Sequence, residues 1–371
     1  MKMNVNDEYD HLLPLSLIES QILPRLTAKS VGRCRCVCKQ WKSFLSAPSF
    51  ARTNIPNNDY KLLLVEDQGN LRTLPDNILH ANPDPSDVYI LASLDGLVCL
   101  GSKSIPTKLL FWNPLTGAYR KLCDPHPHYP FFDLPPFWDG GVGFYKDSSN
   151  DYKLVIVMST GVCDFGAYVY SHKLDIWKEI DFNVGDMSSV NYTWSSAISC
   201  GQCLYFTVEC ICKSRRSWII CFDVETETFR SIPFPHVPTS PPCGSLVVLN
   251  GRVHLCVSYT SYILLKLNEL AGDEEYIDFE LLKELWRMDG DGWVKVSAFS
   301  EPLDNGFRSP YICTTTSGNS VIVLDEEIND SFKKMSTEDF TRQYRYFRSP
   351  SWEYRCSRMI YVESLVSPNC P

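Results

Sequence analysis

Residues 111–119 read Phe111-Trp112-Asn113-Pro114-Leu115-Thr116-Gly117-Ala118-Tyr119. The Asn, Pro, Thr and Gly residues in the centre favour a tight turn, because Pro presets the backbone and Gly accepts a positive φ. Large aromatic residues flank the turn seven positions apart, which predicts a β-hairpin. The same separation recurs along the chain, with the last copy one residue longer, at Leu64 and Leu71, Tyr170 and Trp177, Phe222 and Phe229, Trp286 and Trp293, and Leu324 and Phe332.

The length of this repeat indicates a propeller. The six hairpins start on average 52 residues apart, and kelch-type propeller blades of four strands repeat at about 50 residues. Gly turns at Asp95-Gly96, Cys200-Gly201 and Asn250-Gly251 are each followed by an apolar strand, which we expect to be the inner strand of a blade. We predict an all-β domain of roughly six blades, with five or seven left open, closed by a strand within Tyr344–Val366.

The chain before this repeat has a helical pattern. Ile18, Ile22 and Leu26 lie four positions apart, which places them on one face of a helix. Thr27 can cap a second helix, and a third is expected to run up to Pro48. Proline inside a helix removes a hydrogen bond and clashes with the preceding turn, so Pro24 should bend or end the first helix near Leu23. Three short helices bury too little surface to be stable alone, so we expect this module to pack on the β-domain or on a partner.

Charge also divides the chain into two parts. The segment Leu12–Phe50 carries six bases and one acid, whereas the whole chain has net charge −9 and pI ≈ 5.3. We place the domain boundary at Asn54–Asp59, where the helical periodicity ends. The acidic balance argues against nucleic acid or an anionic membrane as a partner. No signal peptide and no run of eighteen apolar residues is found, so we expect a protein of the cytoplasm and/or nucleus whose 16 cysteines are not a disulfide framework.

The helical segment has two further motifs, Leu13-Pro14 at its start and Arg33-Cys34-Arg35-Cys36-Val37-Cys38-Lys39-Gln40-Trp41 at its end. With these motifs, residues 12–53 resemble the F-box. Gln21, Cys34 and Thr27 depart from the usual Glu, Phe and Pro of that motif. The resemblance implies binding to the Skp adaptor, and through it to cullin. Residues implied to form the adaptor interface or the small core of the module, without assignment between the two, are Leu13, Pro14, Leu17, Ile18, Ile22, Leu23, Leu26, Val31, Val37, Cys38 and Trp41.

The remaining residues, 60–371, contain four motifs in a fixed order: Leu94–Leu100, Phe111–Thr116, Gly143-Phe144-Tyr145 with Asp151–Val155, and Tyr361–Val366. With these motifs, this part of the chain resembles the F-box-associated domain of plant F-box proteins, which is related to kelch propellers. In that family the domain recruits a target protein and has no catalysis of its own. The resemblance therefore implies a small all-α F-box module followed by an all-β kelch-like propeller.

Sites for chemistry were sought separately. The sequence contains no phosphate-binding loop, no nucleophile elbow and no His-Glu-x-x-His helix, so we expect neither an enzyme nor a cofactor. Cys200, Cys203, Cys210 and Cys212 could hold zinc, although alternating strand positions are the preferred interpretation. Asp289–Gly292 is interpreted as a hairpin turn and not as a calcium loop. The Pro-rich stretch with His126 and His128 is either an exposed connector or a ligand-contacting loop.

These observations lead to one expected function and two alternatives. The chain is expected to be the substrate-recognition subunit of a Skp-cullin-F-box ubiquitin ligase, with an unidentified target protein on the propeller. The first alternative is a non-catalytic propeller scaffold that binds the adaptor without directing ubiquitination. In the second, the helical segment is merely a cap on the propeller.

Overall fold

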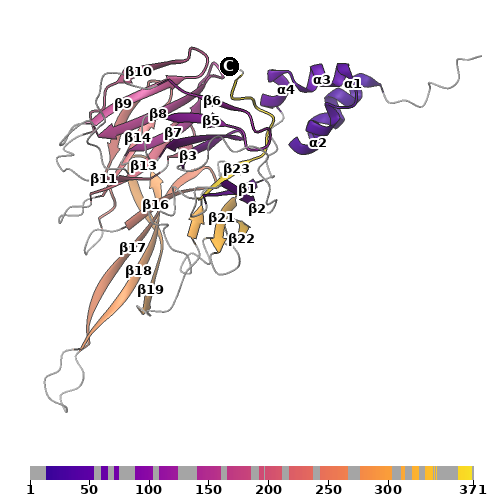
Figure 1. The fold of residues 1–371 in the computed structure, drawn as a ribbon. Coiled ribbons are helices and arrows are strands. Elements are labelled where there is room, and N and C mark those ends of the chain that lie inside the picture. Colours follow the sequence, from indigo (N-terminus) through magenta and orange to yellow (C-terminus); the bar gives the residue numbers. More distant parts are fainter. Residues whose placement is uncertain are drawn as a thin grey trace, which may run out of the picture.

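The computed structural model contains a helical module at one side of a larger β-domain (Figure 1). In the helical module, α1 spans Leu15–Leu17 and continues as a π-helical turn, η1, at Ile18–Ile22, and a 3₁₀ turn, η2, at Leu23–Arg25. Helices α2, α3 and α4 span Ala28–Cys34, Lys39–Leu45 and Pro48–Thr53. The residues described are 14–53, 60–65, 71–74, 88–102, 108–123, 140–159, 165–184, 192–195, 197–210, 217–236, 243–265, 276–302, 311–313, 320–325, 331–336, 338, 340 and 358–369.

Local sequence explains where these helices begin and end. Pro24 lies in η2, where the α-helical pattern of the first segment ends, as predicted. The Thr27 side chain accepts a hydrogen bond from the backbone N–H of Ser30, which caps α2. The predicted third helix ends before Pro48, since α3 stops at Leu45. A further helix that was not predicted, α4, starts at Pro48, a position that suits a residue without a backbone N–H. The module therefore has one more helix than the three predicted.

The described strands form six antiparallel sheets, named here A to F in chain order. Sheet A contains β1 (Tyr60–Val65), β2 (Leu71–Leu74) and β23 (Arg358–Val362), and sheet B contains β3 (Val88–Leu94), β4 (Leu97–Ser102), β5 (Leu109–Trp112) and β6 (Tyr119–Lys121). Sheet C contains β7 (Gly141–Lys146), β8 (Tyr152–Ser159), β9 (Phe165–Ser171) and β10 (Ile176–Ile180).

Sheets D to F are formed by the strands that follow in the chain. Sheet D contains β11 (Tyr192–Trp194), β12 (Ile198–Cys200), β13 (Cys203–Cys210), β14 (Ser217–Asp223) and β15 (Thr228–Ile232). Sheet E contains β16 (Cys243–Leu249), β17 (Arg252–Leu265), β18 (Tyr276–Asp289) and β19 (Gly292–Pro302), and sheet F contains β20 (Tyr311–Cys313), β21 (Ser320–Asp325) and β22 (Ser331–Ser336). This architecture is the predicted kelch-like arrangement, while the blade number of the whole chain stays a prediction.

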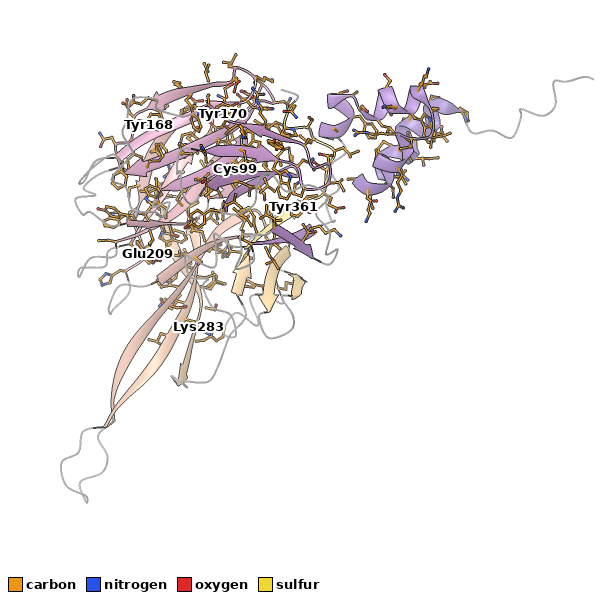
Figure 2. All side chains as sticks on the ribbon, viewed as in Figure 1. Cys99, Tyr168, Tyr170, Glu209, Lys283 and Tyr361 are labelled. Carbon is orange, nitrogen blue, oxygen red and sulfur yellow. The ribbon has the colours of Figure 1, made fainter. Side chains whose placement is uncertain are left out.

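The hydrophobic core is divided among the interfaces between successive sheets. One cluster joins sheets B and C, where the rings of Phe111 and Phe144 stack with centroids 4.7 Å apart. Others join C to D and D to E. The last strand of a sheet is the most exposed, as in β10, whereas the preceding strands are mostly buried. Cys99, Tyr168 and Tyr170 mark this core within the body of the β-domain (Figure 2).

Four of the six predicted hairpins have the expected residues directly opposite each other: Trp112 and Tyr119, Tyr170 and Trp177, Phe222 and Phe229, and Leu324 and Phe332. In the other two hairpins, which are also present, the flanking residues do not lie opposite each other. Leu71 pairs with Val65 and not with Leu64. The hairpin of sheet E has a two-residue turn, Gly290-Asp291, so Trp293 lies opposite Met288 and not opposite Trp286. A shorter turn moves the whole register, and the flanking residues alone do not reveal the turn length.

The three Gly turns each join two paired strands: Asp95-Gly96 joins β3 to β4, Cys200-Gly201 joins β12 to β13, and Asn250-Gly251 joins β16 to β17. The apolar strand that follows each turn is largely buried, and its place as the inner strand of a blade stays a prediction. Gly96 and Gly251 have φ of +83° and +69°, and the preceding Asp95 and Asn250 also have positive φ. This is the geometry that a two-residue hairpin turn requires.

The ends of the β-domain meet in sheet A. Strand β23, close to the C-terminus, pairs with β1, from Tyr60 opposite Val362 to Leu64 opposite Arg358. A return of the chain to the first blade was predicted from Tyr344–Val366, and the strand lies within that segment. Because β1 follows the helical module, this pairing brings both ends of the β-domain to the side where the helices lie (Figure 1).

Strands β17 and β18 project from the opposite end of the β-domain as a long ribbon (Figure 1). They pair as far as Leu265 opposite Tyr276, whereas the pairing of β16 with β17 stops at Cys243 opposite Ser258. Pro241 and Pro242 come just before β16 in the sequence, and proline has no N–H to offer to a ladder. This projection was not predicted from the sequence.

Candidate functional site

The exposed apolar residues of the helical module form its candidate partner-binding surface. Val37 is 65% exposed, Leu17 43% and Ile22 38%. Pro14 and Cys38 are exposed as well. Large apolar side chains of a monomer are normally buried, so exposure of several on a module of about forty residues indicates a surface that a partner covers. Val37 lies in the turn between α2 and α3 and not on the third helix, where the sequence placed it.

Other residues of the predicted set form the core of the module. Leu23 and Val31 are almost completely buried with Leu45 and Phe50, and Ile18, Leu26 and Trp41 pack around them partly buried. These residues therefore belong to the core of the module, while contact of the exposed ones with an adaptor stays a prediction. Leu13 lies outside the described residues.

Arg35 and Cys38 support the helix ends of this module. Arg35 donates two hydrogen bonds to the carbonyl oxygen of Leu45, from Nε at 3.1 Å and Nη2 at 2.7 Å. Burial lowers the pKa of Arg35 from its ordinary value. The Cys38 thiol accepts a hydrogen bond from the backbone N–H of Trp41 at the start of α3. These contacts hold α2 and α3 together beside the exposed turn that carries Val37.

The helical module packs on the β-domain through the chain's C-terminal segment, Glu363–Val366. Leu365 contacts both the core of the module and the cluster between sheets B and C. Ala51 of α4 belongs to that same cluster. A Cβ added to Gly32 of α2 would lie 4.0 Å from Cδ2 of Leu365, so α2 lies directly against this side chain. The module was expected to pack on the β-domain or on a partner, and these contacts show that it packs on the β-domain.

Asn113 fixes the C-terminal segment from the β5–β6 turn. Its Oδ1 accepts hydrogen bonds from the backbone N–H groups of Leu115 and Thr116, which forms the turn. Its Nδ2 donates to the carbonyl oxygens of Ser364 at 3.0 Å and Val366 at 2.7 Å. The side chain is fully buried. Asparagine satisfies both sides of this contact because its amide has an acceptor oxygen and two donor hydrogens.

The β3–β4 turn holds the same segment from a second direction. The Ser364 hydroxyl donates to the carbonyl oxygen of Asp95 and accepts from the N–H of Val366. A Cβ on Gly96 would lie 2.2 Å from Ser364 Oγ, so this site needs glycine for space as well as for its positive φ. The Asp95 carboxylate in turn accepts from Lys146 Nζ at 2.7 Å and Tyr152 Oη at 3.0 Å. The motifs that the sequence singled out therefore meet here, as structural contacts.

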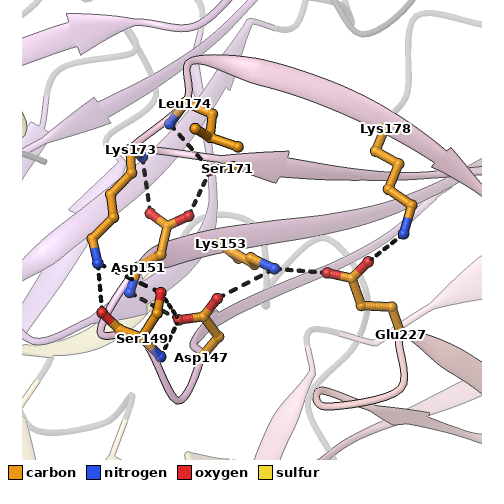
Figure 3. A network of polar contacts seen from close by, with 9 residues as sticks. All are labelled: Asp147, Ser149, Asp151, Lys153, Ser171, Lys173, Leu174, Lys178 and Glu227. Carbon is orange, nitrogen blue, oxygen red and sulfur yellow. Dashed lines mark hydrogen bonds and ion pairs between the residues drawn. The ribbon is translucent and has the colours of Figure 1, made fainter.

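A network of ion pairs joins sheets C and D (Figure 3). Lys153 Nζ lies 2.7 Å from Glu227 Oε1 and 3.3 Å from Asp147 Oδ2, and Lys178 Nζ lies 2.9 Å from Glu227 Oε2. Burial by itself raises the pKa of Glu227, but hydrogen bonds from the two lysines outweigh it and leave that pKa below its ordinary value. Asp151 holds the neighbouring turn, where it accepts from Ser171 Oγ and from the backbone N–H of Lys173.

This network is one copy of a repeated contact between outer hairpins. A base on the last strand of one sheet pairs with an acid in the outer turn of the next sheet: Arg120 with Asp175, Lys178 with Glu227, and Arg230 with Asp291. Indole N–H groups add a second repeat, since Trp177 donates to the Cys123 carbonyl and Trp293 to the Pro233 carbonyl. Both repeated contacts join neighbouring sheets, so we assign these residues a structural role in the packing of the sheets.

The metal sites considered from the sequence find no support in the described part of the chain. No group of three or more His, Cys, Asp or Glu residues there could hold a metal ion. Cys210 is disulfide-bonded, and Cys200 and Cys203 face each other across the β12–β13 turn as free thiols. Asp291 of the suspected calcium loop pairs with Arg230. Cys212, His126 and His128 lie outside the described residues.

Two features were missed from the sequence. Leu365 was not assigned to the helical module, because nothing in a single chain shows that a residue over three hundred positions away completes its core. The repeated base and acid pairs were also missed, although their separations of 55, 49 and 61 residues follow the blade repeat. Aligning charges, and not only apolar residues, on that repeat would have found them. In the described residues no helix has the length and apolar character needed to cross a membrane.

Comparisons with known proteins agree with this architecture. Residues 63–368 match the model of the F-box associated beta propeller domain, and residues 18–53 match the F-box domain. Among curated relatives, F-box only protein 15 of Arabidopsis thaliana is 25% identical over 71% of this chain and 67% of its own length. An F-box protein of the same plant is 28% identical over 60% of this chain and 70% of its own.

A third relative, an F-box/kelch-repeat protein of Arabidopsis thaliana, is 25% identical over 59% of this chain and 60% of its own length. The family model covers most of the chain, and the F-box match covers nearly all of the helical module. The described helices and sheets lie where these two matches place them. The chain therefore belongs to the family of F-box proteins, known from plants, that carry an F-box-associated β-propeller.

Proposed function

We propose that the chain is the substrate-recognition subunit of a Skp-cullin-F-box ubiquitin ligase. In this proposal the F-box binds the Skp adaptor, the adaptor links the chain to cullin, and the propeller holds a target protein. The observation that carries the proposal is the exposed apolar surface of Leu17, Ile22 and Val37 on a module that matches the F-box domain. A partner that covers this surface would gain about 25 cal/mol for each Å² of apolar area removed from water.

Catalysis in such a complex would come from proximity and not from residues of this chain. Binding of target and adaptor to one chain converts the meeting of a target lysine with a charged ubiquitin carrier into an effectively intramolecular event. The propeller loops are the proposed target site, since loops on a rigid β-scaffold vary freely and carry recognition. The acidic net charge of the chain favours a basic target.

The proposal is tested by the affinity of the full chain for purified Skp adaptor. We expect the wild type to bind, and a Val37→Asp variant to bind at least about tenfold more weakly, because a charge would then be buried in the interface. Leu174→Asp is the matched control. Leu174 is an equally exposed aliphatic residue, at 68%, but it lies on the β9–β10 turn of the propeller. Its substitution should leave adaptor binding unchanged.

Two results would contradict the proposal. Failure of the folded wild type to bind the adaptor would leave the helical module as a cap on the propeller. Adaptor binding without co-purification of cullin, and without ubiquitination of any captured protein, would favour the scaffold alternative. Circular dichroism of each variant establishes that a loss of binding is not a loss of folding.

A further inference from the structure

We propose that the C-terminal segment Glu363–Val366 is part of the adaptor-binding module, so that F-box presentation depends on docking of this segment in the propeller. This inference rests on the proposed adaptor binding and adds positioning residues to it. The residues are Leu365, which completes the F-box core, and Ser364 and Asn113, which hold Leu365 in place. None of them belongs to the F-box segment itself.

The first step of the argument is the size of the F-box core. Only Leu23, Ala28, Val31, Leu45, Phe50 and Ala51 are apolar and fully buried among the described residues of the module. A helical unit this small buries too little surface for independent stability. Leu365 supplies a further apolar side chain from outside, and it lies against α2 at Gly32. Removing Leu365 therefore weakens the packing of the whole unit and not only a local contact.

The second step is that the propeller determines where Leu365 lies. Carbonyl oxygens on both sides of Leu365, those of Ser364 and Val366, accept hydrogen bonds from the one buried amide of Asn113. The Ser364 hydroxyl is held by Asp95, and Ser93 Oγ donates to the Ile360 carbonyl at 2.9 Å further along. These contacts come from the β5–β6 turn, the β3–β4 turn and strand β3, all in sheet B. They fix the backbone before and after Leu365 while its side chain points to the F-box core.

The third step is that the F-box is also attached to the β-domain through its own helix α4 and the strand that follows it. Ala51 of α4 packs in the cluster between sheets B and C, together with Leu365 and Val366. Strand β1, which follows the F-box in sequence, pairs with β23, which precedes the C-terminal segment. The F-box is thus held by its own continuation and by the far end of the chain. An adaptor bound to Val37 and Leu17 would have a fixed orientation relative to a target on the propeller.

The experiment compares full-length variants by hydrogen exchange and by adaptor affinity. Leu365→Ala should accelerate amide exchange in α2 and α3 and weaken adaptor binding about tenfold, since only the folded module binds. Exchange in β8 and β9 should not change, which shows that the propeller stays folded. Leu174→Ala is the matched control, because it truncates an exposed leucine on the propeller. It should change neither measurement.

Asn113→Ala provides a second variant that acts from a distance. The hydrogen bonds of Asn113 end on the C-terminal segment and on its own turn, so a role limited to sheet B would leave α2 and α3 unaffected. We expect faster exchange in these helices nevertheless. The inference would be overturned if α2 and α3 of both variants exchanged at the same rate as in the wild type. It would also be overturned if exchange were faster but the affinity for the adaptor were unchanged. If the wild type does not bind the adaptor, the proposed function fails, while the exchange data still decide whether the segment supports the F-box.

Discussion

The outer turns of sheets B and D have the same backbone and different partners. In both, the side chain of the first turn residue, Asn113 or Asp223, accepts hydrogen bonds from the backbone N–H groups of the third and fourth residues, and the fifth residue, Gly117 or Glu227, has a positive φ. In the sheet D turn, Glu227 forms ion pairs with Lys153 and Lys178 of the neighbouring sheet C. The sheet B turn faces the C-terminal segment with the Asn113 amide.

The difference shows how a repeat acquires a special junction. Every other outer turn with a described contact to the preceding sheet uses an ion pair, which tolerates water and some movement. The turn beside the F-box uses a fully buried, uncharged amide instead. A buried amide with all of its partners has one favourable geometry, because an unpaired polar group in the interior costs about 1–3 kcal/mol. The chain therefore places its most specific contact where two domains must keep one orientation.

The largest expected effect comes from Gly96→Ala. A Cβ there would meet Ser364 Oγ at 2.2 Å and the Val362 carbonyl oxygen at 2.7 Å, in addition to the strain of a positive φ. We expect a loss of about 4 kcal/mol in the free energy of unfolding, measured by urea denaturation. Gly251→Ala is the control, with a similar φ of +69° and open space around it. It should cost about 1 kcal/mol, and equal losses at the two sites would contradict the special role of the junction.

Exchanging the first residues of the two turns should give the next largest effect. Asn113→Asp keeps the turn acceptor but turns a carboxylate oxygen toward two carbonyl oxygens, and we expect a loss of about 3 kcal/mol at pH 7. Because burial raises the pKa of a carboxyl group, part of this stability should return as the pH falls and the group is protonated. The reciprocal Asp223→Asn should change stability by less than about 0.5 kcal/mol, since the Asp223 side chain accepts hydrogen bonds from the backbone N–H groups of Glu225 and Thr226 within an exposed turn. Urea midpoints at pH 7 and pH 4 would show both.

Glu227→Gln should have a smaller effect that depends on pH. The pKa of Glu227 is lowered in the folded state from its ordinary value of 4.5. The ionised side chain therefore stabilises the fold at pH values above 4.5, and this stability is lost as the pH falls through the pKa of the folded state. We expect a loss of about 1 kcal/mol at pH 7 that disappears at strongly acidic pH. Glu225→Gln, an exposed neighbour in the same turn, is the control. A difference between wild type and Glu227→Gln that grows on acidification would contradict the assigned ion pairs.

The smallest effect is expected at the most exposed pair of the repeat. The side chains of Arg230 and Asp291 are 48% and 77% exposed, so water and salt screen their attraction. We expect Asp291→Asn to cost less than about 0.5 kcal/mol, and the difference to vanish in 1 M salt. Thermal unfolding at low and high salt measures it. A loss of stability as large as that of Glu227→Gln would show that the contribution of these ion pairs does not depend on their exposure.

Much of the fold followed from local patterns. The hairpins flanked by Trp112 and Tyr119 or by Phe222 and Phe229 were predicted correctly, because alternation and turn residues act within a few positions. The Thr27 cap and the end of the first helix at Pro24 were predicted for the same reason. The extra helix at Pro48–Thr53 and the short turn of sheet E were not, because proline and glycine are compatible with more than one local structure.

Local patterns predicted the class of each half, the repeat that builds the propeller and the set of residues that make up the F-box. These depend on periodicity and on short motifs, which each element carries within itself. The folded chain was needed to show which F-box residues are exposed, such as Val37, and which are core, such as Val31. It also decided that Leu365 and Asn113 belong with the F-box. Burial and hydrogen bonding between distant segments depend on how the sheets close around their axis, and that arrangement is a property of the whole chain.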